Sequence, residues 1–171
     1  MRAIFPGRFQ PFHNGHLYAI KKILDENDSI MIIIENAGES FTFKNPMTAG
    51  ERFEMIFETI MELNLKSEDL IIVPMENIPN NAEWVHHLKI MLPKFDICYS
   101  NNDLVKILME NDDIKVKRIE FKSREIYQGS EIRKRIAMDL EWKNSVPENV
   151  YEFITKNKID KRIKNLYRMI E

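Results

Sequence analysis

Residues 3–16 read Ala-Ile-Phe-Pro-Gly-Arg-Phe-Gln-Pro-Phe-His-Asn-Gly-His, and this stretch decides the fold. Its first three residues are apolar, which is typical of a short buried strand. A helix is predicted over residues 15–26, where apolar side chains recur at helical spacing. The chain therefore begins with a strand, a polar turn and a helix.

The alternation of strands and helices continues along most of the chain. A second strand is predicted over residues 29–34, because the continuous apolar run over 30–34 is typical of a strand of a parallel sheet that is covered on both faces. Thr48 and Glu51 have the spacing of a capping box, which predicts that a second helix begins there after a loop over 35–47. Further strands are predicted over 70–73, 95–99 and 115–121, and further helices over 82–92 and 103–110. This pattern predicts an α/β fold with a doubly wound parallel sheet, in which ligands bind beyond the carboxyl ends of the strands.

The pattern changes near residue 129 to short helical segments. These segments begin near Ser130, near Pro147 and at Asp160, and the last has one apolar stripe. No internal repeat and no linker rich in Gly, Ser or Pro interrupts the sequence. We therefore predict a single domain over residues 1–171, with an α/β core over 1–128 and a helical C-terminal part over 129–171.

Composition excludes several classes of protein. The 171 residues are 44% hydrophobic and 30% charged, which is typical of a globular chain, and their formal net charge of −2 gives no general attraction to nucleic acid or anionic lipid. Residues 115–135 hold eight basic and three acidic residues, but the sparse aromatic residues there argue against nucleic acid binding. No apolar run approaches the roughly 18 residues of a membrane span. The single cysteine, Cys98, excludes an internal disulfide and a cysteine-based zinc site, and it favours a cytoplasmic location.

The turn after the first strand carries the densest set of ligand-binding side chains. It lacks the sequence of a P-loop and that of a dinucleotide fingerprint. Gly7 lets the backbone approach a ligand, and Arg8 supplies a guanidinium. His13 and His16 lie at the helix start, where free amides and the helix dipole favour an anion. These groups predict a polyphosphate site, and a purely structural histidine pair is the alternative.

A second possible anion site precedes the helix near residue 130. Gly129 and Ser130 predict a helix start whose amides are free to bind an anion. Arg133 follows three residues later, where its guanidinium offers two parallel donors to a phosphate. An ordinary cap followed by a surface arginine is the alternative, and the presence of the first cluster makes phosphate binding the favoured interpretation.

Together the two clusters resemble the nucleotidyltransferase superfamily, through His-x-Gly-His at 13–16 and Ser-x-x-Arg at 130–133. The segments at 45–52, 81–85 and 127–133 make the chain similar to the archaeal-type nicotinamide-nucleotide adenylyltransferases, and this resemblance spans residues 1–168. It implies a Rossmann-like nucleotidyltransferase fold and an enzyme that joins the adenylyl group of ATP to nicotinamide mononucleotide, giving NAD and pyrophosphate. It also implies Mg²⁺ accompanying ATP, a homo-oligomer, and acceptance of nicotinic acid mononucleotide by many members.

The resemblance assigns roles to individual residues. Four side chains would hold the ATP phosphates during catalysis, namely Arg8, His13, His16 and Arg133. Asn81 and Trp84 would hold the nicotinamide ring, with Trp84 stacking on the cationic pyridinium, although burial of Trp84 in the core is the alternative. The remaining expected contacts with ATP are Gly7, Phe9, Gln10, Gly15, Tyr127, Gly129 and Ser130. No metal site built from protein side chains is expected.

The sequence departs from the family pattern after the second strand. The family shows Gly-Ser-Ala-Gln and then Ser-His-Thr, whereas this chain has Glu-Asn-Ala-Gly at 35–38 and Ser-Phe-Thr at 40–42. The Glu35 carboxylate would repel the mononucleotide phosphate unless it turns away, binds Mg²⁺ or pairs with Arg52. Asn77 also stands where many relatives have an acid.

Direct displacement is the expected mechanism, because no side chain offers a convincing covalent nucleophile. Cys98 lies inside a predicted strand, where it is most simply a small buried apolar residue. Two alternatives to the expected function remain. One is the same chemistry on another phosphate, such as phosphopantetheine or glycerol phosphate, and the other is a catalytically weak sensor that binds nucleotide.

Overall fold

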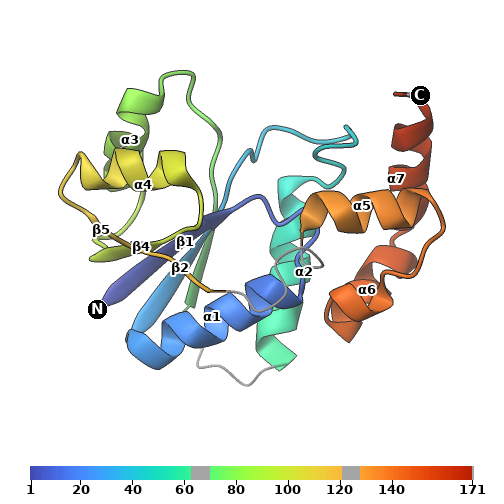
Figure 1. The fold of residues 1–171 in the computed structure, drawn as a ribbon, viewed down its shortest axis with the longest axis horizontal. Coiled ribbons are helices and arrows are strands. Elements are labelled where there is room, and N and C mark those ends of the chain that lie inside the picture. The colour runs from blue at the N-terminus through green and yellow to red at the C-terminus, as the bar shows by residue number, and fades with distance from the viewer. Residues whose placement is uncertain (63–69, 121–127, 171) are drawn as a thin grey trace.

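The computed structural model of the chain describes residues 1–62, 70–120 and 128–170. Within these residues a sheet of parallel strands runs in the order β3-β2-β1-β4-β5, with helices on both faces (Figure 1). The strands are β1 (Arg2–Gly7), β2 (Ser29–Ile34), β3 (Leu70–Pro74), β4 (Ile97–Tyr99) and β5 (Lys115–Lys117). This order confirms the doubly wound parallel sheet and places β1 beside β4, where the strand order reverses and where such folds bind ligands.

Four helices of the α/β part divide between the two faces of the sheet. Two of them, α1 (Asn14–Glu26) and α2 (Ala49–Glu62), pack against one core. The other two, α3 (Trp84–Met91) and α4 (Asp103–Glu110), pack against a second core on the opposite face. A 3₁₀ turn, η2 (Asn81–Glu83), leads directly into α3.

The interior strand β2, which lies between β3 and β1, contributes to both cores. Its side chains at 30, 32 and 34 face α1 and α2, whereas Met31 and Ile33 face α3 and α4. All five of these side chains are at most 1% exposed. Because successive side chains of a strand point to opposite faces and both faces are covered, the strand needs a continuous apolar run.

The C-terminal part consists of α5 (Gly129–Ala137), η3 (Lys143–Ser145), α6 (Glu148–Lys156) and α7 (Ile159–Arg168). Helix α6 packs on α2, and α7 packs on α5 (Figure 1). Buried side chains of all three helices join the core that also covers β1. Residues 121–127 lie outside the described part of the chain, so the division at residue 128 stays a prediction.

An arginine ties α7 to the start of α2. The predicted capping box is present, because the Thr48 hydroxyl accepts from the Glu51 amide at 3.1 Å and Glu51 accepts from the Thr48 amide at 2.9 Å. Arg162 donates to the two carboxylate oxygens of Glu51 at 2.7 and 2.8 Å and to the Pro46 carbonyl at 3.1 Å. The C-terminal part therefore holds the end of the loop that precedes α2.

Three predicted elements are shorter than expected. The strand predicted over 95–99 begins only at Ile97. The helix predicted over 82–92 begins as the 3₁₀ turn, which the Asn80 side chain caps by accepting from the Ala82 amide at 3.1 Å. The strand predicted over 115–121 ends at Lys117, because the Asn101 side chain pairs with both backbone groups of Ile119, at 2.8 and 2.9 Å. No described helix combines the length and the apolar character that a membrane crossing requires.

Candidate active site

The turn between β1 and α1 is organised around a buried phenylalanine. Phe9 is 1% exposed and has a positive φ of 50°. A Cβ on Gly7 would lie 2.9 Å from the Phe9 ring, so packing requires a glycine there. The Phe9 ring also packs against the His16 ring, with 4.7 Å between the ring centroids. Phe9 therefore supports the turn from inside, and its buried ring leaves only backbone atoms to contact a ligand.

Gln10 joins the turn to two distant segments. Its side chain donates to the Met47 carbonyl at 2.9 Å and accepts from the Met47 amide at 3.0 Å. Its own backbone carbonyl accepts from Nη1 of Arg133 at 2.6 Å. The loop before α2 and the helix α5 are thereby both fastened to the turn after β1.

The two histidines cap the start of α1 for each other. Nδ1 of His13 accepts from the His16 amide, and Nδ1 of His16 accepts from the His13 amide, each at 3.3 Å. The rings stack with centroids 3.5 Å apart. An Nδ1 that accepts carries no proton, so each neutral ring carries its proton on Nε2.

Burial keeps both of these rings neutral. It lowers the pKa of His13 to about 3. Burial, assisted by repulsion from His13, also lowers the pKa of His16 well below its ordinary value. At neutral pH each ring therefore offers one uncharged Nε2–H donor and no positive charge.

Two arginines bring positive charge and free donors to the same place. Arg133 is 4% exposed, and burial together with the charge of Arg8 lowers its pKa to about 10, which leaves it charged at neutral pH. Nε of Arg133 and Nη1 of Arg8 are buried and have no partner among the described residues. Buried donors of this kind are costly unless something accepts from them, so they favour a bound anion.

These side chains line one cavity of about 290 Å³, here called the phosphate cavity. Its lining comes from the turn after β1 and from the start of α5, namely Arg8, Phe9, Gln10, Pro11, His13, His16, Gln128, Gly129, Ser130 and Arg133. An added Cβ on Gly129 would lie 2.9 Å from the Gln10 carbonyl oxygen, so α5 can approach only through a glycine. The two sequence clusters therefore meet at one cavity, which carries cationic groups and neutral donors suited to a polyphosphate.

Two described residues that were expected to contact ATP, Gly7 and Gly15, do not belong to this lining. Gly15 is buried in the first turn of α1. Tyr127 lies outside the described residues. The binding roles of all the other expected residues stay predictions, although their positions agree with them.

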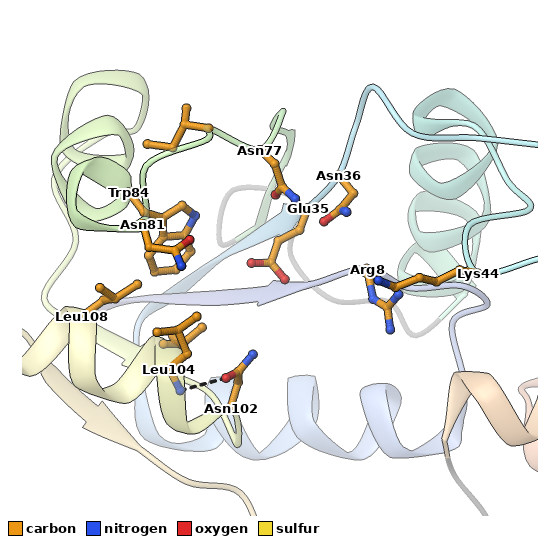
Figure 2. A pocket seen from close by; sticks show the side chains of 12 residues that line it. Arg8, Glu35, Asn36, Lys44, Asn77, Asn81, Trp84, Asn102, Leu104 and Leu108 are labelled. Atoms are coloured by element: carbon orange, nitrogen blue, oxygen red, sulfur yellow. Dashed lines mark hydrogen bonds between the residues drawn. The ribbon is translucent and has the colours of Figure 1, made fainter. Parts of the chain in front are cut away.

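A second cavity of about 490 Å³, here called the larger cavity, shares Arg8 with the first. Figure 2 shows Arg8 and Lys44 on one side of it and Trp84 with Asn81 on the other. Trp84 is half-buried and packs against the core of its face while it also lines the cavity, so the burial and the binding interpretation of this residue are compatible. Its lining residues are Arg8, Glu35, Asn36, Lys44, Asn77, Ile78, Asn81, Trp84, Asn102, Leu104, Val105 and Leu108.

The Glu35 carboxylate does not pair with Arg52, which excludes one of the three arrangements considered above for this side chain. The fully buried Arg52 guanidinium instead donates to the backbone carbonyls of Arg8, Glu35 and Asn36, at 2.9, 2.6 and 2.9 Å. The Glu35 side chain points into the larger cavity (Figure 2) and forms no hydrogen bond or ion pair with the described residues. Burial raises the pKa of Glu35, and the charge of Arg8 opposes that rise.

Sequence reasoning missed several side chains of the larger cavity. Asn36 follows β2 closely and Asn102 follows β4, so polar residues just after the predicted strands were a usable signal. Lys44 lies within a loop and gave no such signal. In the described ranges 1–62, 70–120 and 128–170, no group of three His, Cys, Asp or Glu could hold a metal ion.

Comparisons with known proteins agree with this arrangement. Residues 4–135 match the family described as Cytidylyltransferase-like. The chain is 42% identical over 166 residues to a nicotinamide-nucleotide adenylyltransferase of Methanococcus aeolicus, covering 97% of this chain and 95% of that protein. A protein of the same name from Archaeoglobus fulgidus is 38% identical, with 97% of both chains covered.

A solved structure is also similar. It is the bifunctional NMN adenylyltransferase/ADP ribose pyrophosphatase from Francisella tularensis complexed with AMP and a manganese ion, with a TM-score of 0.81 and 20% identity. The match covers 96% of this chain and 51% of that protein, so this chain spans about half its length. At that identity the likeness concerns the fold, and it confirms the Rossmann-like architecture.

Proposed function

Because this chain belongs to the Cytidylyltransferase-like family and, within it, to the nicotinamide-nucleotide adenylyltransferases, we propose that it synthesises NAD. It transfers the adenylyl group of ATP to nicotinamide mononucleotide and releases pyrophosphate. The observation that supports this function most directly is the position of Arg8, which lines both cavities. A reaction that joins two phosphates requires its substrates to meet at such a point.

Each substrate has a cavity that suits its chemistry. The ATP phosphates occupy the phosphate cavity, where Arg133 and Arg8 have free buried donors. The mononucleotide occupies the larger cavity, with its ring against Trp84 and its phosphate toward Arg8. Contact between an aromatic face and a pyridinium cation contributes about 0.5 to 2 kcal/mol.

The reaction is an in-line displacement. An oxygen of the mononucleotide 5′-phosphate forms a bond to the α-phosphorus of ATP. The bond from that phosphorus to the oxygen bridging toward the β-phosphate breaks, and pyrophosphate leaves with the electron pair. A phosphate monoester is already anionic at neutral pH, so the attack needs no general base.

The side chains of the phosphate cavity stabilise the charge that moves onto pyrophosphate. Arg8 and Arg133 supply cationic donors, and His13 and His16 supply neutral Nε2–H donors that are already oriented by their mutual cap. Cys98 takes no part, because it is fully buried and burial raises the pKa of its thiol. Mg²⁺, when bound with ATP, neutralises charge on the phosphates. The proposal also includes a homo-oligomer that acts in the cytoplasm.

An acceptor panel tests the function. The purified chain is incubated with ATP, Mg²⁺ and one of four acceptors: nicotinamide mononucleotide, nicotinic acid mononucleotide, phosphopantetheine or glycerol phosphate. We expect pyrophosphate release together with NAD when nicotinamide mononucleotide is the acceptor. Failure to form a dinucleotide from either mononucleotide would overturn the proposed function. Exchange of labelled pyrophosphate into ATP without any acceptor would overturn direct displacement, because it requires an adenylyl-enzyme.

A further inference from the structure

Glu35 holds a fixed position at the carboxyl end of β2. Its amide donates to the Gly7 carbonyl at 2.9 Å, and its own carbonyl accepts from Arg52 at 2.6 Å. With its backbone held on both sides, the residue directs its side chain into the larger cavity (Figure 2). Among the described residues it is the one acidic side chain that lines either cavity.

The carboxylate has no partner of its own in this cavity. The charged groups that line the cavity with it are Arg8 and Lys44, which lie together on one side, and the neighbouring asparagine side chains are neutral (Figure 2). Arg8 also lines the phosphate cavity, so bound phosphates compete for its charge. A poorly solvated carboxylate whose neighbouring cation is shared with another anion gains from a ligand that brings positive charge.

The two mononucleotides of the proposed function differ in this property. The base of nicotinamide mononucleotide is a pyridinium with a neutral amide, so its net charge is positive. The base of nicotinic acid mononucleotide adds a carboxylate, so its net charge is zero. A mononucleotide that reaches from Trp84 to Arg8 passes over Glu35, which lies between them (Figure 2).

We propose that Glu35 makes the larger cavity select the mononucleotide whose base is positively charged, and so favours nicotinamide over nicotinic acid mononucleotide. The carboxylate attracts the pyridinium of both acceptors but repels the carboxylate of the second. This inference rests on the proposed function and adds the residue that sets its acceptor preference. It concerns binding and orientation of the acceptor, because Glu35 takes no proton in the reaction.

The test compares the two acceptors in one protein. For wild type and Glu35→Gln, kcat/KM is measured with each mononucleotide at saturating ATP and Mg²⁺, or the inhibition constant where an acceptor gives no product. The ratio of the two values cancels any difference in the fraction of folded enzyme. We expect Glu35→Gln to lower the preference for nicotinamide mononucleotide at least about tenfold, since a charge–charge contact is lost in a partly desolvated site. A change of less than threefold, or a change in the opposite sense, would overturn the proposal.

Two further variants separate charge from shape. Glu35→Asp keeps the negative charge, so it should retain most of the preference; a loss as large as that in Glu35→Gln would overturn the electrostatic explanation. Glu76→Gln removes the same charge from an exposed position just beyond β3 that does not line the cavity, and the ratio should stay at the wild-type value. If wild type uses neither mononucleotide, the proposed function fails. If wild type uses them and the Glu35 variants leave the ratio unchanged, only the present inference fails.

Discussion

The phosphate cavity and the larger cavity are built in different ways. In the first, His13 and His16 cap each other and Arg133 is bonded to the Gln10 carbonyl, so these groups are oriented before any ligand arrives. In the second, the side chains of Glu35 and Trp84 form no hydrogen bond with the described residues. Substitutions in the first cavity should therefore affect catalysis strongly, whereas substitutions in the second should change acceptor affinity with little effect on the fold.

The largest expected effect tests the preorganised cavity. Arg133→Lys should lower kcat/KM at least about 10²-fold, because an ammonium cannot bond the Gln10 carbonyl and present parallel donors to phosphate at once. Pyrophosphate release is the measurement. Arg135→Lys is the matched control, since Arg135 lies on the same helix and pairs with Glu131 at 3.0 Å outside the cavity. Equal activity of the two variants would show that the buried guanidinium is dispensable.

A second effect is on stability and arises from the neutral histidine pair. The folded-state pKa of His13 is about 3, below the unfolded value of about 6.5, so the unfolded chain binds more protons between these limits. The free energy of unfolding should therefore decrease as the pH falls from 6.5 toward 3, and His13 contributes up to about 1.4 kcal/mol per pH unit. His13→Asn keeps a good capping residue but removes this titration, so its slope should be smaller.

Urea unfolding of both proteins without nucleotide at several pH values measures this difference. Above pH 7 the two slopes should coincide, which controls for effects unrelated to protonation of His13. Parallel curves between pH 4 and 6 would contradict the assignment of a buried neutral ring.

The smallest effect is expected in the larger cavity. Trp84→Leu should raise the KM for nicotinamide mononucleotide between about twofold and thirtyfold, the range that corresponds to losing about 0.5 to 2 kcal/mol of aromatic contact with a cation. The KM for ATP should stay near its wild-type value, because Trp84 does not line the phosphate cavity. Trp84→Phe keeps an aromatic face and should recover part of the affinity. A rise in the KM for ATP alone would place the ring of the mononucleotide elsewhere.

Much of the fold could be predicted from the sequence because its signals are local. The apolar run of β2 over residues 30–34 and the Thr48–Glu51 capping box each depend on neighbours within a few positions, and both are present as predicted. The end of β5 could not be predicted in this way. It is set by Asn101, which pairs with the backbone of Ile119, 18 positions further along the chain.

In the candidate site, too, one part could be predicted from local sequence and another part could not. Its phosphate cavity could be assembled from two motifs, because residue type and helix-start position already define an anion site. The direction of the Glu35 side chain depends on Arg52, whose guanidinium bonds backbone carbonyls of three residues and leaves the carboxylate unpaired. Whether the Arg52 guanidinium donates to backbone carbonyls or to the Glu35 carboxylate is decided only when segments that are distant in the sequence pack together.

The position of Arg8 in the wall between both cavities has a thermodynamic consequence. Two anionic ligands that share one guanidinium cannot bind independently, so the first to arrive changes the affinity for the second. By linkage the second changes the affinity for the first by the same factor. In calorimetric titrations, the affinity for the cofactor precursor should therefore change when the nucleoside triphosphate is bound, and the reverse should also hold, even under conditions where no turnover takes place.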